Sequence, residues 1–327
     1  MSVYSMLDDG LFQGKGPIFP ETYPLERAYP LYPANFSDTE KDVLPFRYQP
    51  VSIHTLEGEK DELLLSYYTT SCPITTNLTK NLTNSPGYDE IMKKFNSTIA
   101  ELSKKLNVPA SSLEALKDLG DTLIVNYFEG KPLPGEIDLN SGLGRNLTFL
   151  LNYMAYYLSA GTPLQRQLFS MNPLYQFKED LEQILKGSKT VVRLYSAHDS
   201  TLVPVLAPMG IASHECLYKN FFENGNFTSC YFPKFASALR FEAWKNETDE
   251  NSSEVRVYYD EVVQNICKSE NGHCKWEAFK DFIQNITQGK GIDYYRETCV
   301  SGAQEVVSNP RTKLKIALYV SCGQQTR

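Results

Sequence analysis

Apolar residues recur at the three- and four-residue spacing of one helical face in several stretches of the chain. One stretch starts at Ser85-Pro86, a dipeptide that suits the start of a helix. In a second, Ser111 or Ser112 is the expected N-cap. Three such stretches have their apolar face at Ile91, Phe95, Ile99, Leu102 and Leu106; at Leu113, Leu116, Leu119 and Leu123; and at Leu147, Leu150, Leu151, Met154 and Leu158. Two further helices are expected over 177–185 and 275–288. We therefore expect a mainly helical block over about residues 76–184.

Four other features are expected from the remaining stretches of the chain. Residues 189–196 form an apolar run that suits a buried parallel strand. Residues 236–245 and 254–262 alternate with period two and predict a hairpin whose tip carries two Asn-x-Ser/Thr triplets. A short strand is expected at 50–56, after a Pro-rich stretch that opens with a helix over 2–12. The order of the elements predicts an α/β fold in which the helical block interrupts a sheet-containing core.

Composition and charge restrict the classes of protein that the chain fits. It has 327 residues, 42% of them hydrophobic and 22% charged, which excludes collagen, low-complexity disorder and coiled coil. The length suits two domain-sized units, or one α/β core with a large insertion. The formal net charge of −7 makes the chain a poor nucleic-acid binder overall, although it is compatible with a small basic pocket for a phosphate. No apolar run approaches the ~20 residues that a membrane span needs.

Asn-x-Ser/Thr triplets are frequent and indicate a glycoprotein of the secretory pathway. Nine triplets without proline at x occur, which is more than chance predicts for this composition. They start at Asn35, Asn77, Asn81, Asn96, Asn146, Asn226, Asn246, Asn251 and Asn285. The alternative is a surface rich in Asn, Ser and Thr with accidental matches. We expect a lysosomal or extracellular location.

The seven cysteines agree with that compartment. They contain no Cys-x-x-Cys pair, so the spacing of zinc and thioredoxin-like sites is absent from the sequence. The candidate pairs are Cys267 with Cys274, which flank a tight loop, Cys216 with Cys230, and Cys72 with Cys299 over a long range, which leaves Cys322 over. Sequence does not prove this connectivity, and buried free thiols are the alternative.

The N-terminal residues lack the features of a signal peptide. They contain no basic n-region, no apolar h-region and no small-residue cleavage site. For a glycoprotein with disulfides, we therefore expect either unconventional export or a start that lies upstream of Met1.

The candidate site is the string Tyr195–Thr201, between the predicted buried strand and a short helix over 202–209. Ligands of α/β sheets bind at the carboxyl ends of strands, and the free N–H groups at a helix start suit an anion. His198 can donate a hydrogen bond to a phosphoryl oxygen, and Asp199 can protonate a leaving alkoxide if it is kept protonated. A His-Asp dipeptide is common, however, and Asp199 or Ser200 could simply cap the helix.

The longer string Leu194–Leu206 resembles the second motif of the histidine acid phosphatases. Weaker matches follow in order along roughly residues 1–300. Met1–Tyr4 and Leu11–Pro20 resemble the segments that follow the family's phosphate-binding arginine. The other matching segments are Pro50–Thr55, Ser71–Pro73, Asn140–Met154, Ala236–Glu242, the Cys267–Cys274 loop and Glu297–Cys299. The resemblance implies a histidine-phosphatase-like mixed sheet flanked by helices, with an inserted helical subdomain. It also implies the disulfides Cys72–Cys299 and Cys267–Cys274.

The family hydrolyses phosphomonoesters at acid pH through a phosphohistidine, so the resemblance implies that His198 binds the phosphate and Asp199 protonates the leaving group. The family's nucleophilic histidine and its arginine clamp belong to an Arg-His-Gly-x-Arg-x-Pro motif. This chain contains no Arg-His dipeptide. We therefore expect an N-terminally incomplete acid phosphatase chain, without the family's first central strand and inactive as written.

Two alternatives to that expectation stay open. One is a non-catalytic pseudophosphatase glycoprotein with a binding or structural role. The other is the phytase-like or phosphoglycerate-type branch of the superfamily. Of the remaining histidines, His54 is assigned to a structural strand, and His214 and His273 to surface loops.

The expected parts are 1–75, the N-terminal part of the α/β core; 76–140, a helical insertion; 141–300, the rest of the core with the His-Asp motif; and 301–327, a C-terminal tail. The expected partner is a small phosphomonoester or a phosphoprotein, with no nucleic acid, no membrane span and a possible homodimer. No cofactor is implied, because the sequence has no P-loop, no Gly-x-Gly-x-x-Gly and no metal-ligand spacing.

Overall fold

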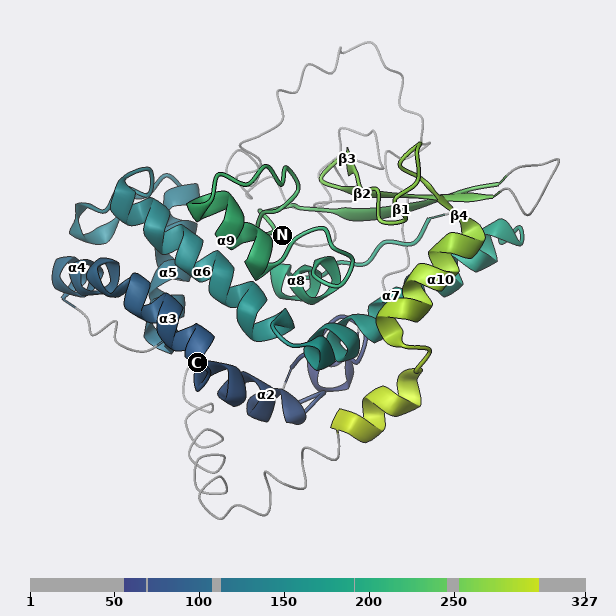
Figure 1. Ribbon diagram of the computed structural model, residues 1–327, viewed down its shortest axis with the longest axis horizontal. Helices are drawn as coiled ribbons and strands as arrows, with labels where there is room; N and C mark the ends of the chain where they lie inside the picture. The colour runs from purple at the N-terminus through teal and green to yellow at the C-terminus, as the bar shows by residue number, and fades with distance from the viewer. Residues whose placement is uncertain (1–55, 69, 108–112, 191, 246–252, 300–327) are drawn as a thin grey trace, which may run out of the picture. The chain divides into compact units, whose positions relative to one another are not determined.

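The computed structural model describes residues 56–68, 70–107, 113–190, 192–245 and 253–299 (Figure 1). Every helix and strand given below belongs to one compact unit, whereas Leu56 and residues 194–196 cluster outside that unit. The described residues form a mixed α/β protein, in which a run of helices precedes a small antiparallel sheet. The fold class that the sequence predicts is therefore confirmed. Within this described part, no helix is both long and apolar enough to cross a bilayer.

Helix α6 (Gly142–Ala160) is the centre of the helical part (Figure 1). Its neighbours are α2 (Ile74–Thr83), α4 (Asn96–Leu106), α5 (Leu113–Phe128), α7 (Pro163–Leu185), α8 (Asp199–Leu206) and α9 (His214–Phe222). Buried side chains on several sides of α6, such as Leu147 and Tyr156, pack against these helices. The Ser141 hydroxyl caps the helix by accepting a hydrogen bond from the Gly144 N–H, and Gly161 is the C-cap residue.

The helix predicted from Ser85 onward is two helices. The Ser85 hydroxyl accepts a hydrogen bond from the Tyr88 N–H and starts α3 (Pro86–Lys94). At Phe95 the backbone leaves helical geometry, with ψ at 9°, and α4 follows. The predicted apolar face is correct, because Ile91, Phe95, Ile99 and Leu102 are all buried. The Phe95 ring stacks on Phe149 at 5.5 Å, so tertiary packing fixes the residue at which the chain bends.

Helix α7 is much longer than the predicted 177–185. It begins with a capping box between Thr162 and Gln165, and it continues through the buried Pro173. Several of its polar side chains are buried and donate to distant carbonyls, as Gln167 does to Thr287 O at 2.8 Å. Buried polar residues and an internal proline hide the helical period from a sequence search.

The sheet consists of β1 (Leu239–Trp244), β2 (Glu254–Tyr259), β3 (Val262–Val263) and β4 (Cys274–Lys275), and β2 pairs antiparallel with the other three. The predicted hairpin is therefore confirmed, with Phe241 opposite Val257. The inner residues of β2 are buried, and α10 (Trp276–Thr287) packs on β2 and on α7. The hairpin tip, the predicted helix 2–12 and residues 50–55 of the predicted strand lie outside the described residues.

The buried strand predicted at 189–196 is wrong for the described residues. Residues 192–197 pair with no strand of the described part, and the side chains of Val192 and Leu194 are 62% and 48% exposed. A strand requires a neighbour for its ladder, and the described residues supply none here. Instead, Arg193 is held on α7, because its Nε lies 3.1 Å from Asp180 Oδ1.

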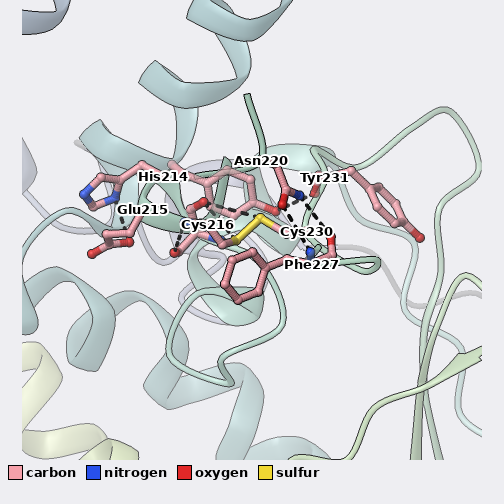
Figure 2. The surroundings of a disulfide bond; sticks show 9 residues. His214, Glu215, Cys216, Asn220, Phe227, Cys230 and Tyr231 are labelled. Atoms are coloured by element: carbon pink, nitrogen blue, oxygen red, sulfur yellow. Dashed lines mark hydrogen bonds and ion pairs between the residues drawn. A yellow bond between two sulfur atoms is a disulfide. The ribbon is translucent and has the colours of Figure 1, made fainter. Parts of the chain in front are cut away.

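Three disulfides join cysteines of the described residues, and all three candidate pairs are confirmed. Cys72 bonds to Cys299 at the end of a helical stretch over 292–299, Cys267 to Cys274, and Cys216 to Cys230 (Figure 2). Figure 2 shows that the Cys216–Cys230 bond joins α9 to the loop that follows it. Cys322 lies outside the described residues.

Candidate functional site

The His-Asp motif opens helix α8. His198 is the N-cap residue in extended geometry, and Asp199 is the first helical residue. The side chains of both are exposed. Apolar residues Val203, Val205 and Leu206 follow on the buried side of the helix. The motif therefore presents an imidazole and a carboxyl group to solvent from a helix whose other end is in the core.

Two contacts hold the first turn of α8 against residues 57–68. The Thr201 hydroxyl donates a hydrogen bond to Leu64 O at 2.8 Å, and the Tyr67 hydroxyl donates to Ser200 Oγ. Burial raises the pKa of Tyr67 well above its usual value, so this phenol stays a hydrogen-bond donor at acid and neutral pH. The first turn is thus fixed by a segment more than 130 positions away in the chain.

Asp199 also acts locally at the helix start. Its Oδ1 accepts a hydrogen bond from the Ser200 N–H, while the Thr201 N–H donates to His198 O. The N-cap residue of α8 is His198, so neither Asp199 nor Ser200 caps the helix. A carboxyl group that receives one N–H keeps its second oxygen for another partner, so this contact is compatible with a role in proton transfer.

A second carboxyl group near Asp199 comes from helix α5. Burial raises the pKa of Asp121, Asp199 and Asp118 add to this rise through their negative charge, and Lys117 opposes it. The Asp121 carboxyl of α5 is therefore close enough to that of Asp199 for the two negative charges to repel each other, which favours the protonated form of Asp121. The sequence gives no sign of Asp121, because one acidic residue on the exposed side of a helix resembles any solvated charge.

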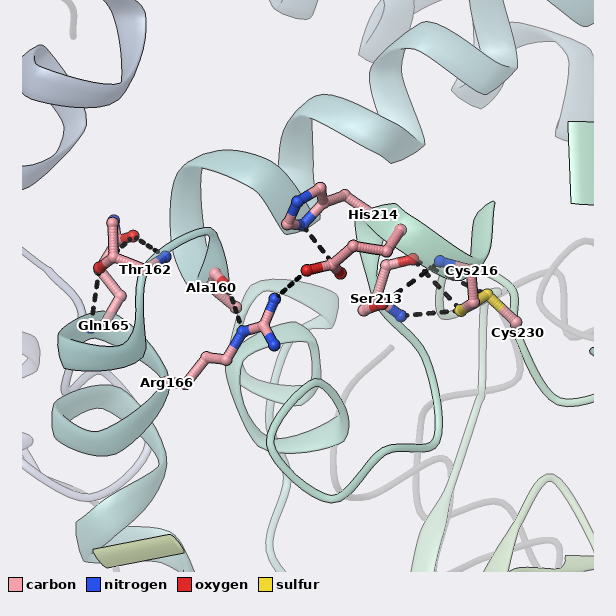
Figure 3. A network of polar contacts seen from close by, with 9 residues as sticks. Ala160, Thr162, Gln165, Arg166, Ser213, His214, Cys216 and Cys230 are labelled. Carbon is pink, nitrogen blue, oxygen red and sulfur yellow. Dashed lines mark hydrogen bonds and ion pairs between the residues drawn. A yellow bond between two sulfur atoms is a disulfide. The ribbon is translucent and has the colours of Figure 1, made fainter. Parts of the chain in front are cut away.

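The prediction that His214 lies on the surface is wrong. His214 is the first residue of α9, and its side chain is buried edge-on against the rings of Tyr153 and Tyr157. Its Nδ1 lies 3.3 Å from Glu215 Oε2, and Arg166 donates to Glu215 Oε1 at 2.5 Å (Figure 3). Arg166 also donates to Ala160 O, so the cluster fastens the start of α9 to the end of α6 and the start of α7.

Burial lowers the pKa of His214, and the charge of Arg166 adds to this effect, while Glu215 opposes it. A folded chain with a lowered histidine pKa binds fewer protons than the unfolded chain. The stability that His214 gives is therefore complete above about pH 6.5 and is lost as the pH falls below that value. We expect His214→Gln to flatten the fall of Tm on acidification. A His273→Gln control that flattens it equally would contradict this cause.

The other predicted residues are dispersed. His273 is half-buried, with Nδ1 at 3.4 Å from Glu254 Oε2 on β2. His54 lies outside the described residues, as do Asn35, Asn246 and Asn251. The remaining triplets start on α2 (Asn77 and Asn81), α4 (Asn96), α6 (Asn146), the loop after α9 (Asn226) and α10 (Asn285).

Residues 155–260 match the family model described as the histidine phosphatase superfamily (branch 2). The matched region runs from the second half of α6 through α8 to the end of β2, and it includes His198 and Asp199. This match confirms the resemblance to the histidine phosphatases that the sequence predicts, over residues 155–260.

Curated relatives align with the chain at low identity. The putative acid phosphatase 5 of Caenorhabditis elegans is 28% identical over 209 residues, which are 62% of this chain and 44% of that protein. The 2-phosphoxylose phosphatase 1 of Xenopus tropicalis is 27% identical over 57% of this chain and 37% of its own length. The human 2-phosphoxylose phosphatase 1 is 24% identical, over 62% and 42%. The alignments thus span less than half the length of these relatives.

Proposed function

We propose that this chain, whose residues 155–260 match the histidine phosphatase superfamily (branch 2), carries the His-Asp part of an acid phosphatase-type site for phosphomonoesters. The observation that carries the proposal is the exposed pair His198 and Asp199 at the start of α8, inside the matched region. The relatives are phosphatases by name, which supports a hydrolase function at the level of the family.

In this proposal, each group has a separate role. His198 donates a hydrogen bond from its imidazole to a phosphoryl oxygen, and the positive end of the α8 dipole favours the same anion. Asp199, when protonated, gives its proton to the leaving alkoxide. Because Asp199 must be protonated for that step, the reaction it serves is favoured at acid pH.

The sequence of this chain holds no Arg-His-Gly-x-Arg-x-Pro motif, so it supplies no residue in the position of the family's nucleophile. We therefore propose that the 327-residue chain binds phosphate and phosphomonoesters without turning them over. A non-catalytic role in binding is the second candidate function, and the same missing motif favours it.

Phosphate titration of purified chains by calorimetry tests the proposal. We expect His198→Ala to weaken phosphate binding by about 10- to 150-fold, because a hydrogen bond to a charged group contributes about 1.5–3 kcal/mol. The matched control His273→Ala should bind phosphate like the wild type. Equal affinity of the His198→Ala and wild-type chains would contradict the proposal. Turnover of p-nitrophenyl phosphate that depends on Asp199 would contradict the absence of catalysis.

We also propose that the chain is a glycoprotein of the secretory pathway, which its three disulfides support. Asn146 is an exception among the triplets. Its Nδ2 donates to Thr98 Oγ1 at 3.1 Å, and a sugar on that nitrogen would displace the contact. Glycopeptide mass spectrometry of the folded, exported chain should find sugars on the exposed Asn81, Asn96, Asn226 and Asn285 and little on Asn146. Full occupancy at Asn146 would contradict this.

A further inference from the structure

A groove of about 340 Å³ lies between α6 and α9. Its lining includes Arg145, Phe149 and Asn152 of α6 and Leu217 and Phe221 of α9. The α6 residues are spaced by four and three positions, so they share one face of that helix. The lining does not include His198 or Asp199, so the groove is a surface separate from the His-Asp motif. Its volume is at the lower end of the range for small-molecule sites.

Two polar side chains of the groove, those of Arg145 and Asn152, lack partners within the described chain, whereas the amide of Asn220 in the same lining is bonded to Phe227. The exposed guanidinium of Arg145 makes no hydrogen bond or ion pair with another described residue, and the same holds for the half-buried amide of Asn152. Arg145 is also the one charged residue among the described residues that line the groove. A free guanidinium beside an apolar wall suits a planar anion that also has an apolar body.

The apolar wall of the groove is formed before any ligand arrives. The rings of Phe149 and Phe221 stack at 4.2 Å and join the two helices. Helix α9 is held by the Cys216–Cys230 disulfide, and the Asn220 amide exchanges two hydrogen bonds with the backbone of Phe227 (Figure 2). The Arg166–Glu215 ion pair fastens the first turn of α9 to α7 (Figure 3). A wall that is already rigid loses little entropy when it binds a ligand.

We propose that this groove binds a small amphiphilic monocarboxylate, with its carboxylate on Arg145 and its apolar body against Phe149 and Phe221. A single positive charge favours a monoanion over a phosphate dianion in a chain whose net charge is −7. Arg145 and Asn152 are seven positions apart, which is about 10 Å along a helix. A second polar group of the ligand at that distance from the carboxylate meets the Asn152 amide.

The test uses 4-(4-hydroxyphenyl)butyrate as the probe, titrated into the intact chain by calorimetry. We expect saturable binding that Arg145→Gln weakens by about tenfold, which corresponds to about 1.4 kcal/mol. Arg240→Gln is the matched control, because Arg240 is also exposed but lies on β1, and it should leave binding unchanged. Asn152→Ala should remove the preference for this probe over 4-phenylbutyrate. Circular dichroism melts establish that each variant is folded.

Three results would overturn the inference. The first is no saturable binding by the wild-type chain. The second is equal affinity of the Arg145→Gln and wild-type chains, or equal affinity for the uncharged amide of the probe. The third is competition between the probe and inorganic phosphate that His198→Ala abolishes, because the probe would then occupy the His-Asp motif. Failure of phosphate binding at His198 alone would leave the groove unaffected, so the two proposals are separable.

Discussion

A chain in which Cys72 and Cys299 are both alanine is expected to lose about 5 kcal/mol of its free energy of unfolding. The disulfide joins positions separated by 227 residues, and a bridge between such distant points removes many conformations from the unfolded chain. Both residues are buried in one cluster with Leu168, Phe169 and Tyr295, so no solvent contact compensates for the loss. Denaturant unfolding followed by circular dichroism measures the change.

The matched control is the double variant Cys267→Ala/Cys274→Ala. This bridge spans a separation of only 7, for which the same chain-entropy relation gives about 2.5 kcal/mol. Equal losses in the two double variants would show that loop length does not determine the stabilisation by Cys72–Cys299.

Replacing Phe279 with alanine is expected to cost about 3–5 kcal/mol of unfolding free energy. The Phe279 side chain is 0% exposed and lies where α10 packs on the sheet. Its ring stacks on Trp276 at 5.9 Å and meets the ring of Phe241 on β1 edge-on at 6.1 Å. Alanine would leave a cavity between two rings that fixed backbones hold apart. Thermal and denaturant unfolding both measure this loss.

Phe235→Ala is the control for ring deletion as such. The Phe235 side chain is 57% exposed and touches the Phe128 ring at a centroid distance of 4.5 Å. Its loss should cost about 1 kcal/mol or less. Equal losses of unfolding free energy in the two variants would contradict a stabilising role for the packing of Phe279 between α10 and the sheet.

Elements with a one-sided apolar pattern could be predicted from the sequence. The hairpin over β1 and β2 alternates with period two because one face is buried under α10, and α6 and α10 show a clear helical period. Helix α9 was not predicted, because its nine residues span too few turns for a helical period to stand out, although Leu217, Phe221 and Phe222 share one side. The strand predicted over 189–196 was wrong because an apolar run does not reveal whether a neighbouring strand is present to pair with it.

The candidate site was predictable only where its residues are contiguous. His198 and Asp199 stand together in the sequence and remain together on α8. Tyr67 and Asp121 reach the same region from a distant segment and from α5, and no local spacing marks them. The burial of His214 depends on Tyr153 and Tyr157 of α6, so its position close to Cys216 in the sequence gave the wrong expectation of a surface loop.

Phosphate binding by His198 is tested most directly by NMR of the histidine rings during a titration with inorganic phosphate. The ring signals of His198 should shift along a saturable curve, while those of the buried His214 and of His273 beside Glu254 stay in place. The His198→Ala chain assigns the shifting signal. A His198 signal that does not move, or a uniform shift of all histidine signals, would contradict a phosphate site at the start of α8.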